Sequence, residues 1–368
     1  MSTKKDNFSD KDKNFMRLAL NLARARLGLT GNNPSVGCVI VKNNKIISIG
    51  QTGFNGRPHA EYNAIKNSFE NLQGSKMYVT LEPCNHYGKT PPCTKKIISS
   101  GINEVFYSIN DVDKKVKGKS FKILKKKNIN VKTGLLKIEA MKLYESYFTN
   151  RVSKLPFVTG KIAISKNNLI YSEKQKRITD KISDKLTHFL RFKNDAILIS
   201  SKTLNIDNPK LSCRLKGYEN FSPIRIILDK NLDIKFNSYI FKSANKANTI
   251  IFHNSFDKFK IKNLERKGIN LIRSRLNRQN HFDLKKILKR LYHLEVRNLL
   301  VEGGDKITKN FLLNRLFNRF YVFESPKRLS KFKKFQLFTS HDILNKKYSS
   351  NNKIRSKLAK DNITIYKR

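Results

Sequence analysis

The sequence predicts an α/β fold in two domains, and three observations support this. The chain has 368 residues, which is long for one ordinary domain. Short apolar runs with strand composition alternate with amphipathic helical segments in both halves, a pattern typical of α/β sheets. A polar joint, Ser-Lys-Leu-Pro, follows a helical segment just after residue 150. We therefore expect one domain over residues 1–150 and a second over residues 154–368.

The first half begins with a helix and a hairpin. Residues 14–28 place apolar side chains on one helical face, and the segment TGNNP ends that helix. Two short apolar runs separated by KNN predict the hairpin. The remaining elements expected in this half are a helix at 59–69, a strand at 76–83, a helix at 93–101, a strand at 104–109, and helices at 120–128 and 140–152.

The second half starts with a strand at 156–165 and repeats the alternation. The elements expected after it are a helix at 179–193, strands at 195–200, 224–229, 248–253 and 269–274, a helix at 282–294, a strand at 298–304, a helix at 307–317 and a strand at 319–325. Residues 200–214, SSKTLNIDNPKLSCR, carry polar groups and an Asn-Pro turn, which predict a loop. The sequence after Pro326 gives no clear assignment.

The chain is strongly basic, with 76 Lys and Arg against 28 Asp and Glu. Such an excess raises nucleic acid as a partner. However, residues 1–150 carry 26 basic and 11 acidic residues, hence +15, and the rest carries 50 and 17, hence +33. Because both halves share the charge, a compositional bias explains it better than a dedicated binding surface. The sequence has neither an apolar run of 18 residues nor a signal-like N-terminus, so we expect a cytoplasmic protein.

His59, Cys84 and Cys93 form a candidate metal site. Zinc binds imidazole nitrogen and thiolate, and a catalytic zinc keeps three protein ligands and a position for water. The ligands lie at expected strand-to-helix junctions, where a helix N-terminus favours thiolate over thiol. Glu61 can take a proton from the water and deliver it to a leaving amine. A His-x-Glu pair alone is often chance and isolated cysteines are often structural, but the ordered set predicts a catalytic zinc site.

The same residues match the zinc-deaminase signature, His-x-Glu followed by Pro-Cys, in which the Glu is an acid/base and not a ligand. In nucleobase deaminases the second half of this signature is Pro-Cys-x-x-Cys. Here eight residues separate Cys84 from Cys93, so the spacing departs from that class.

The segments NNPSVGCVIV, HAE and EPCNHYGKTPPC resemble the N-terminal half of a bifunctional riboflavin-biosynthesis family, the diaminohydroxyphosphoribosylaminopyrimidine deaminases/5-amino-6-(5-phosphoribosylamino)uracil reductases. The long cysteine spacing, with GKTPPC inside it, is that family's version of the motif. DVDKKVKGKS is similar to another family segment, with Ser120 where Gly is usual. The resemblance implies a cytidine-deaminase-like α/β/α domain, then a dihydrofolate-reductase-like α/β domain, with zinc and NADPH as cofactors.

The resemblance also implies roles for single residues. In the first domain, Asn33 matches the pyrimidine-binding Asn, and the ribose phosphate would be held by His86, Lys89 and Thr90. In the second domain, the implied substrate residues are Gln175, Arg191, Leu211, Arg214 and Glu302. The implied cofactor residues are Ala163, Arg177, Thr203 and Asp207 and, in the loop after VEGG, Gly304, Asp305, Lys306, Ile307, Thr308, Lys309 and Asn310. The two implied substrate arginines suit a phosphate, because a guanidinium group binds phosphate in a bidentate manner.

The expected function is a two-step conversion of 2,5-diamino-6-ribosylamino-4(3H)-pyrimidinone 5′-phosphate. Zinc-dependent hydrolytic deamination comes first, and NADPH-dependent reduction of the ribosyl group to ribityl follows. We expect no nucleic-acid or membrane partner, and a homo-oligomer remains open. One alternative is a nucleic-acid base deaminase with a basic binding domain, which would fit the zinc motif and the charge. Another is a deaminase with a non-catalytic reductase-like module, because residues 172–179, SEKQKRIT, depart from the family's Ser-Gly-x-Ser-x-Trp-Ile-Thr.

Overall fold

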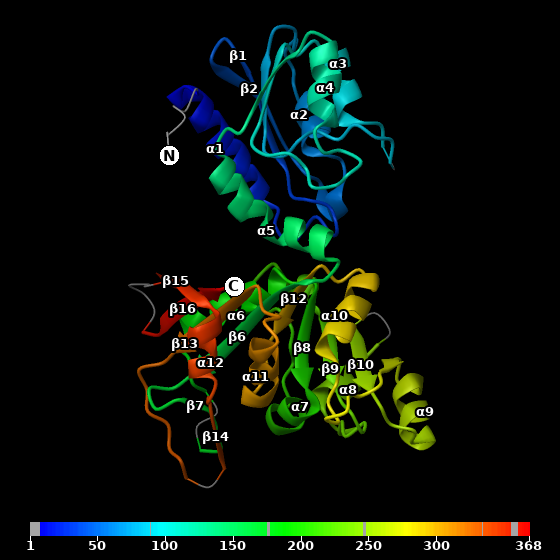
Figure 1. The fold of residues 1–368 in the computed structure, drawn as a ribbon, viewed down its shortest axis with the longest axis vertical. Coiled ribbons are helices and arrows are strands. Elements are labelled where there is room, and N and C mark those ends of the chain that lie inside the picture. Colours follow the sequence, from blue (N-terminus) through cyan, green and yellow to red (C-terminus); the bar gives the residue numbers. More distant parts are fainter. Residues whose placement is uncertain (1–7, 89, 175–176, 246–247, 333, 355–359) are drawn as a thin grey trace. The chain divides into compact units, whose positions relative to one another are not determined.

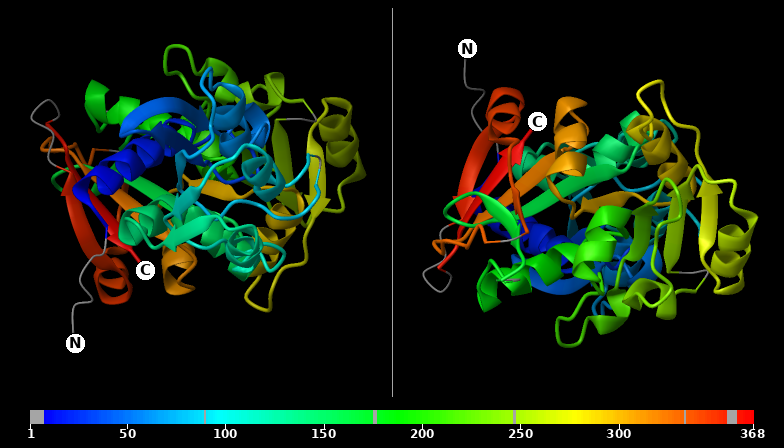
Figure 2. Two further views of the ribbon diagram at one scale, coloured as in Figure 1. Left: turned by 90° about the horizontal axis from the view of Figure 1, so that it is seen from above. Right: turned by 90° about the horizontal axis from the view of Figure 1, so that it is seen from below.

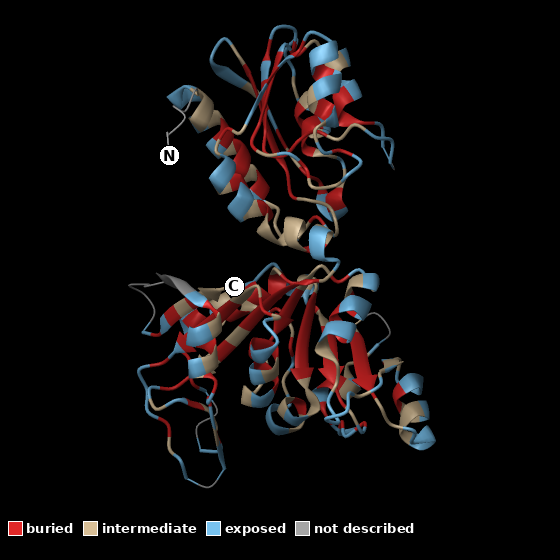
Figure 3. Cartoon of the chain, viewed as in Figure 1, coloured by how far each residue is buried: buried red, intermediate tan, exposed pale blue. Residues whose placement is uncertain are grey.

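The computed structural model describes residues 8–88, 90–174, 177–245, 248–332, 334–354 and 360–368. The chain divides into two compact units, Met1–Ser153 and Lys154–Arg368 (Figure 1). Each unit has its own sheet, whose strands are mostly buried, and helices whose outer faces are exposed (Figure 3). No helix within the described ranges is long and apolar enough to cross a membrane.

The first unit is built on a five-stranded mixed sheet with the order β2-β1-β3-β4-β5. The first strand pairs antiparallel with the second and the third, while the third, fourth and fifth run parallel. Its strands are β1 (Gly37–Lys42), β2 (Lys45–Gln51), β3 (Lys76–Val79), β4 (Glu104–Tyr107) and β5 (Asn130–Thr133). Its helices are α1 (Asp10–Ala25), η1 (Phe54–Gly56), α2 (Ala60–Lys66), α3 (Cys93–Ser99), α4 (Lys119–Lys126) and α5 (Lys137–Ser153).

Helices cover both faces of this sheet, with α1 and α5 on one side and α2, α3 and α4 on the other (Figure 1). Helix α2 lies very close to β2, because Gly50 has no side chain. A Cβ at Gly50 would stand 2.2 Å from the carbonyl oxygen of Ala60, far inside van der Waals contact. This close packing fixes the N-terminus of α2, and with it His59 and Glu61.

The second unit is built on a nine-stranded sheet with the order β11-β10-β9-β8-β12-β6-β13-β16-β15. All strands from β11 to β13 run parallel, and β16 and β15 complete the edge with antiparallel pairing. A separate two-stranded sheet joins β7 and β14. The strands are β6 (Phe157–Ile164), β7 (Leu169–Ser172), β8 (Ala196–Ser200), β9 (Ile224–Leu228), β10 (Thr249–His253), β11 (Asn270–Arg273), β12 (Asn298–Val301), β13 (Arg319–Glu324), β14 (Phe335–Leu337), β15 (Ser349–Ile354) and β16 (Asn362–Lys367).

Helices flank the nine-stranded sheet on both faces (Figure 2). Because successive strand residues point to opposite faces, Leu198 joins one core while Ile197 and Ile199 join the other. Helices α10, α11 and α12 pack on the first core, and α6, α7, α8 and α9 pack on the second. The helical segments are α6 (Lys181–Phe192), α7 (Ser201–Asp207), η2 (Glu219–Phe221), α8 (Tyr239–Lys242), α9 (Lys258–Arg266), α10 (Leu284–His293), α11 (Asp305–Leu313) and α12 (His341–Lys347).

The predicted α/β alternation is confirmed in both halves, but one prediction about its elements was wrong. Residues 200–214 were expected to form a loop, yet Ser201–Asp207 is the helix α7. The hydroxyl of Ser200 caps this helix by accepting a hydrogen bond from the backbone N–H of Thr203. A short capped helix of this kind is easily taken for a polar loop, because seven residues show little helical periodicity.

Candidate metal centre and cofactor cavity

The three predicted metal ligands converge at two helix N-termini. His59 is the N-cap residue of α2, Cys93 is the first residue of α3, and Cys84 follows β3. Their ligand atoms all lie within 4.8 Å of one another. The Nδ1 atom of His59 lies 3.3 Å from Sγ of Cys93 and 3.5 Å from Sγ of Cys84. The backbone N–H of Cys93 donates to Sγ of Cys84 at 3.3 Å.

This donor set fits a zinc ion. One imidazole and two thiols are ligands that zinc prefers, and three of them leave a fourth tetrahedral position for a water. Hydrogen bonding from the Cys93 side chain lowers the pKa of Cys84 to about 4, against the effect of burial. Cys84 is therefore a thiolate at neutral pH, which is the form that binds metal.

Glu61 lies beside the ligands in the first turn of α2 and is only 4% exposed. Burial raises the pKa of Glu61 to about 7, although the neighbouring His59 partly opposes the shift. A carboxyl group that titrates near neutrality can both accept and release a proton. Glu61 therefore has the location and the acidity of a general acid/base.

A cavity of about 200 Å³ opens onto this centre. Of the residues expected to bind the substrate, Asn33 and His86 line the cavity. Thr90 is exposed and accepts a hydrogen bond from the guanidinium of Arg57, and Lys89 lies outside the described residues. Asn33 packs closely against Gly56, whose φ is +88°. A Cβ at Gly56 would stand 2.2 Å from Nδ2 of Asn33, so this position needs a glycine.

The segment DVDKKVKGKS forms one wall of the cavity, a position that the sequence alone did not reveal. Asp111, Asp113 and Val116 line the cavity, although no role was expected for any of them. The carboxylate of Glu82 holds this segment in place. It accepts backbone N–H groups from Asp111 at 3.2 Å, Gly118 at 3.0 Å and Ser120 at 3.2 Å. Sequence reasoning also missed Arg57 and Arg151, which complete the lining with cations.

A second cavity, of about 530 Å³, lies in the other unit where β6, β8 and β12 end. Gly304 caps α11 there, and the free N–H groups of a helix N-terminus are suited to a phosphate. The expected substrate and cofactor residues that line this cavity are Ala163, Arg191, Thr203, Asp207, Leu211, Glu302, Gly304, Asp305, Lys306 and Ile307. The expected cofactor residues that continue along α11 without lining it are Thr308, Lys309 and Asn310.

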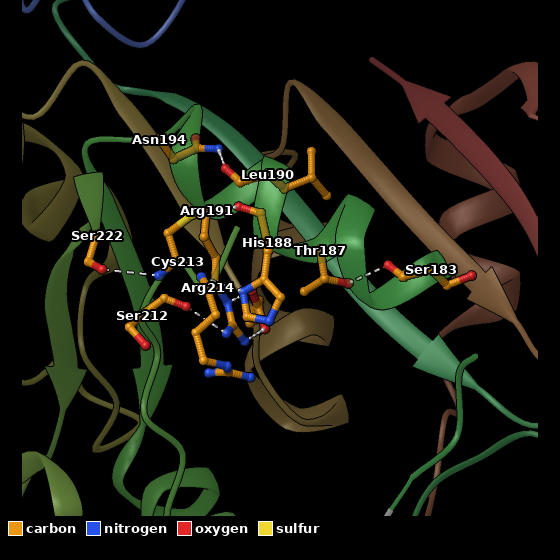
Figure 4. A network of polar contacts seen from close by, with 11 residues as sticks. Ser183, Thr187, His188, Leu190, Arg191, Asn194, Ser212, Cys213, Arg214 and Ser222 are labelled. Carbon is orange, nitrogen blue, oxygen red and sulfur yellow. Dashed lines mark hydrogen bonds and ion pairs between the residues drawn. The ribbon is translucent and has the colours of Figure 1, made fainter. Parts of the chain in front are cut away.

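Arg191 is held inside this cavity by an internal ion pair. Its Nε and Nη2 atoms donate to the two carboxylate oxygens of Glu302, each at 2.9 Å. Its Nη1 atom donates to the carbonyl oxygen of Ser212 at 3.2 Å, within the polar network around His188 (Figure 4). Arg191, expected to bind a substrate phosphate, is thus engaged by other groups of the protein itself.

Two expected arginines lie outside this cavity lining. Arg214 is exposed outside the cavity lining, and its backbone N–H donates to Nδ1 of His188 at 3.2 Å (Figure 4). Arg177 pairs with Asp184 and lines a different hollow. Gln175 lies outside the described residues.

Lys161 lines the second cavity and was not foreseen. It lies on β6, and burial lowers the pKa of its amine, with the charge of Arg191 acting in the same direction and that of Glu302 against it. Its Nζ atom lies 5.0 Å from the ring centroid of Phe323. The sequence does show a lysine inside an apolar strand pattern. This pattern could have indicated a functional residue, because a buried lysine is rare unless it has a function.

Comparison with known proteins gives one matching family for each unit. The family described as the cytidine and deoxycytidylate deaminase zinc-binding region matches residues 9–109. The family described as the RibD C-terminal domain matches residues 164–360.

Single relatives match most of the chain. The riboflavin biosynthesis protein RibD of Aquifex aeolicus is 38% identical over 318 residues, which cover 86% of this chain and 87% of the relative. The protein of the same name from Actinobacillus pleuropneumoniae is 34% identical over 86% of this chain and 84% of the relative.

Solved structures agree with the fold of the whole chain. A diaminohydroxyphosphoribosylaminopyrimidine deaminase/5-amino-6-(5-phosphoribosylamino)uracil reductase from Thermotoga maritima matches with a TM-score of 0.82 and 31% identity, over 97% of this chain and 98% of the other. RibD from Acinetobacter baumannii matches with a TM-score of 0.83 and 25% identity over the same shares.

Proposed function

The chain belongs to the RibD family of bifunctional riboflavin-biosynthesis enzymes, and from this premise we propose how its own residues act in the two reactions. Its N-terminal part is a zinc-dependent deaminase and its C-terminal part is an NADPH-dependent reductase. The observation that best supports the assignment of residues is the convergence of His59, Cys84 and Cys93 beside a buried Glu61.

The deaminase acts on 2,5-diamino-6-ribosylamino-4(3H)-pyrimidinone 5′-phosphate. His59, Cys84 and Cys93 would hold zinc, which lowers the pKa of a bound water to about 7. Glu61 accepts a proton as the water oxygen bonds to the ring carbon that carries the 2-amino group. It then gives this proton to the amino nitrogen, so the C–N bond breaks and ammonia leaves. Asn33 orients the pyrimidine ring.

The phosphate of this substrate lies at the open end of the cavity in our proposal. His86, Lys89 and Thr90 hold it there, since these residues share one loop. A cavity of about 200 Å³ is of a size suited to a small anionic substrate.

The reductase uses the second cavity. Thr203, Asp207 and the N-terminus of α11 would hold NADPH, which would supply a hydride to the C1′ carbon of the ribosyl group. The ring oxygen released from C1′ in this reduction must gain a proton. We assign this proton to Lys161, because a buried amine with a lowered pKa releases a proton more readily than an exposed one.

The remaining residues of this half take supporting roles. Arg191 positions Glu302, and the exposed Arg214 is the better candidate for the substrate phosphate. Ala163 and Leu211 line the cavity walls that the ligands contact. Arg177 and Gln175 remain candidates for cofactor and substrate respectively.

The experiment is an incubation with the pyrimidine substrate and NADPH, with products resolved by mass. We expect wild-type protein to give the deaminated ribityl product. Glu61→Gln should keep about one zinc per chain and release no ammonia, because the metal ligands stay while the proton acceptor is lost. Lys161→Met should accumulate the deaminated but unreduced compound.

Each variant can contradict its own assignment. Full ammonia release by Glu61→Gln would remove Glu61 from the mechanism, and full reduction by Lys161→Met would remove Lys161. If wild-type protein never oxidises NADPH with the deaminated substrate, the C-terminal part is a non-catalytic module. Deamination of tRNA or single-stranded DNA with a steep loss of binding in salt would favour a nucleic-acid substrate.

A further inference from the structure

Arg57 is a half-buried cation beside the deaminase centre, to which no role was given above. It follows η1 and comes two residues before His59. Its side chain lines the same cavity as Glu61 and His86. Its side chain therefore lies between the cavity that holds Glu61 and the loop that carries Thr90.

The guanidinium of Arg57 lies against that loop. Its Nη1 atom donates a hydrogen bond to the hydroxyl oxygen of Thr90. Its Nη2 atom would stand 3.4 Å from a Cβ placed on Gly88, which is close van der Waals contact. The guanidinium thus holds the Thr90 hydroxyl and lies next to Gly88, where a larger residue would come into contact with it.

The guanidinium group of Arg57 also has donors left that could bind an anion. Among the described residues, no carboxylate forms an ion pair with Arg57. Arg151, the other arginine of the cavity, also has no carboxylate ion pair among the described residues, but it donates to the carbonyl oxygen of Asn32 at 3.1 Å and lies over the ring of Tyr147 at 5.2 Å. A guanidinium carries five donors in a planar fork, so Arg57 can hold Thr90 and still bind an anion.

The charges around the cavity make this cation important. The cavity is lined by four carboxyl groups, those of Glu61, Glu82, Asp111 and Asp113. Negative charge on these groups repels a phosphate dianion unless nearby positive charge offsets it. Arg57 supplies a positive charge that offsets part of this negative charge on the side of the cavity next to Thr90.

We propose that Arg57 selects phosphorylated substrates in the deaminase site. It positions the hydroxyl of Thr90 and donates directly to the 5′-phosphate of the pyrimidine substrate. This inference rests on the proposed function, because it names a group of that same substrate.

The test compares ammonia release from the 5′-phosphorylated substrate and from its dephosphorylated form. Arg57→Ala should lower kcat/KM for the phosphorylated substrate on the order of 10- to 100-fold, as expected for lost hydrogen bonds between charged groups. The value for the dephosphorylated form should change less than about threefold. Arg57→Lys should restore part of the selectivity, since lysine keeps the charge but not the fork.

Lys95 provides the matched control. It lies in the first turn of α3, and its Nζ atom donates to the hydroxyl of Tyr87 at 3.3 Å, so it is a cation beside the same loop, but it does not line the cavity. Lys95→Ala should leave the selectivity unchanged. Zinc content, measured for every variant, shows whether the neighbouring metal site survives the substitution.

A binding measurement separates failure of this inference from failure of the proposed function. Ribose 5-phosphate should raise the unfolding temperature of wild-type protein and Lys95→Ala more than that of Arg57→Ala. If Arg57→Ala loses activity equally on both substrates, or is stabilised by ribose 5-phosphate as well as wild type, Arg57 does not select the phosphate. If wild-type protein releases no ammonia from either substrate, the proposed function itself is wrong.

Discussion

Two buried carboxyl groups have pKa values that move in opposite directions. Burial raises the pKa of Glu61 to about 7, because His59 is too weak a partner to offset the lost hydration. Burial would also raise the pKa of Glu302, but the charge and hydrogen bonds of Arg191 outweigh it and lower the pKa. The first group is therefore ready to exchange a proton, and the second remains ionised to hold an arginine.

The ion pair between Arg191 and Glu302 should stabilise the C-terminal unit as long as both partners are present. Glu302→Gln removes one charge and leaves the other buried, so we expect a loss of about 3 kcal/mol in the free energy of unfolding at neutral pH. Chemical denaturation of the full chain, followed with a probe of the C-terminal unit, measures it. Lys286→Ala, which breaks an exposed pair with Asp283, should cost less than about 0.5 kcal/mol.

The ion pair between Arg191 and Glu302 also predicts how the free energy of unfolding depends on pH. The pKa of Glu302 in the folded state lies below its ordinary value of 4.5, so its stabilising contribution is complete above about pH 4.5. That contribution is lost as the pH falls through the lower folded-state pKa. The stability difference between wild type and Glu302→Gln should therefore shrink on acidification. A difference that grows in acid would contradict the assignment of the charge.

At the scale of elements, the wall of the deaminase cavity depends on two residues that flank it. Glu82 holds the wall through three backbone N–H groups, and Ser120 holds the start of α4. The buried hydroxyl of Ser120 donates to the carbonyl oxygen of Pro83 at 2.5 Å. The serine that departs from the family pattern thus adds a contact between the wall and the segment that carries Cys84.

Ser120→Gly should therefore destabilise the N-terminal unit. It leaves the carbonyl oxygen of Pro83 without its donor and places a flexible residue in the first turn of α4, which together cost about 1–2 kcal/mol. The unfolding temperature of the N-terminal transition measures this loss. Ser99→Gly, at an exposed hydroxyl near the end of α3, is the control and should cost less. An equal loss in both variants would mean that the contact with Pro83 contributes nothing.

Elements with strong patterns were predictable, and elements that depend on neighbours were not. The apolar runs of β1 and β8 and the amphipathic α10 are visible in the sequence because one period dominates each of them. By contrast, β5 at the edge of the first sheet and β16 next to the edge strand β15 carry polar residues along their length, so the sequence alone gave no assignment there. Their strand form comes from pairing with β4 and β13.

At the scale of the whole molecule, each unit has a separate core and a separate cavity. The candidate metal ligands found among the described residues all belong to the first unit. The two activities should therefore respond differently to loss of the metal.

Removal of zinc with a chelator should abolish ammonia release and lower the unfolding temperature of the N-terminal unit, because ligand binding stabilises the folded state. NADPH oxidation with the deaminated substrate should persist, and the C-terminal transition should not move. Return of zinc should restore ammonia release. Loss of both activities on chelation would contradict the assignment of the metal to one unit.

The sequence by itself determined the chemistry of the deaminase half. His59, Glu61, Cys84 and Cys93 lie in short segments whose order and spacing define the ligands and the acid/base, and local strand and helix patterns place them at element ends. The α/β class and the presence of two domains follow from the same local patterns. These features depend on neighbours along the chain, which a sequence displays directly.

Only the tertiary structure decided which distant residues meet. The pair of Arg191 with Glu302 joins positions 111 residues apart, and Lys161 reaches the same cavity because β12 lies beside β6 in the sheet. Arg57 lines the deaminase cavity and contacts Thr90, 33 residues further on. Strand order and helix packing create such contacts, and the free energy that selects them is summed over a whole core and is not encoded in any one segment.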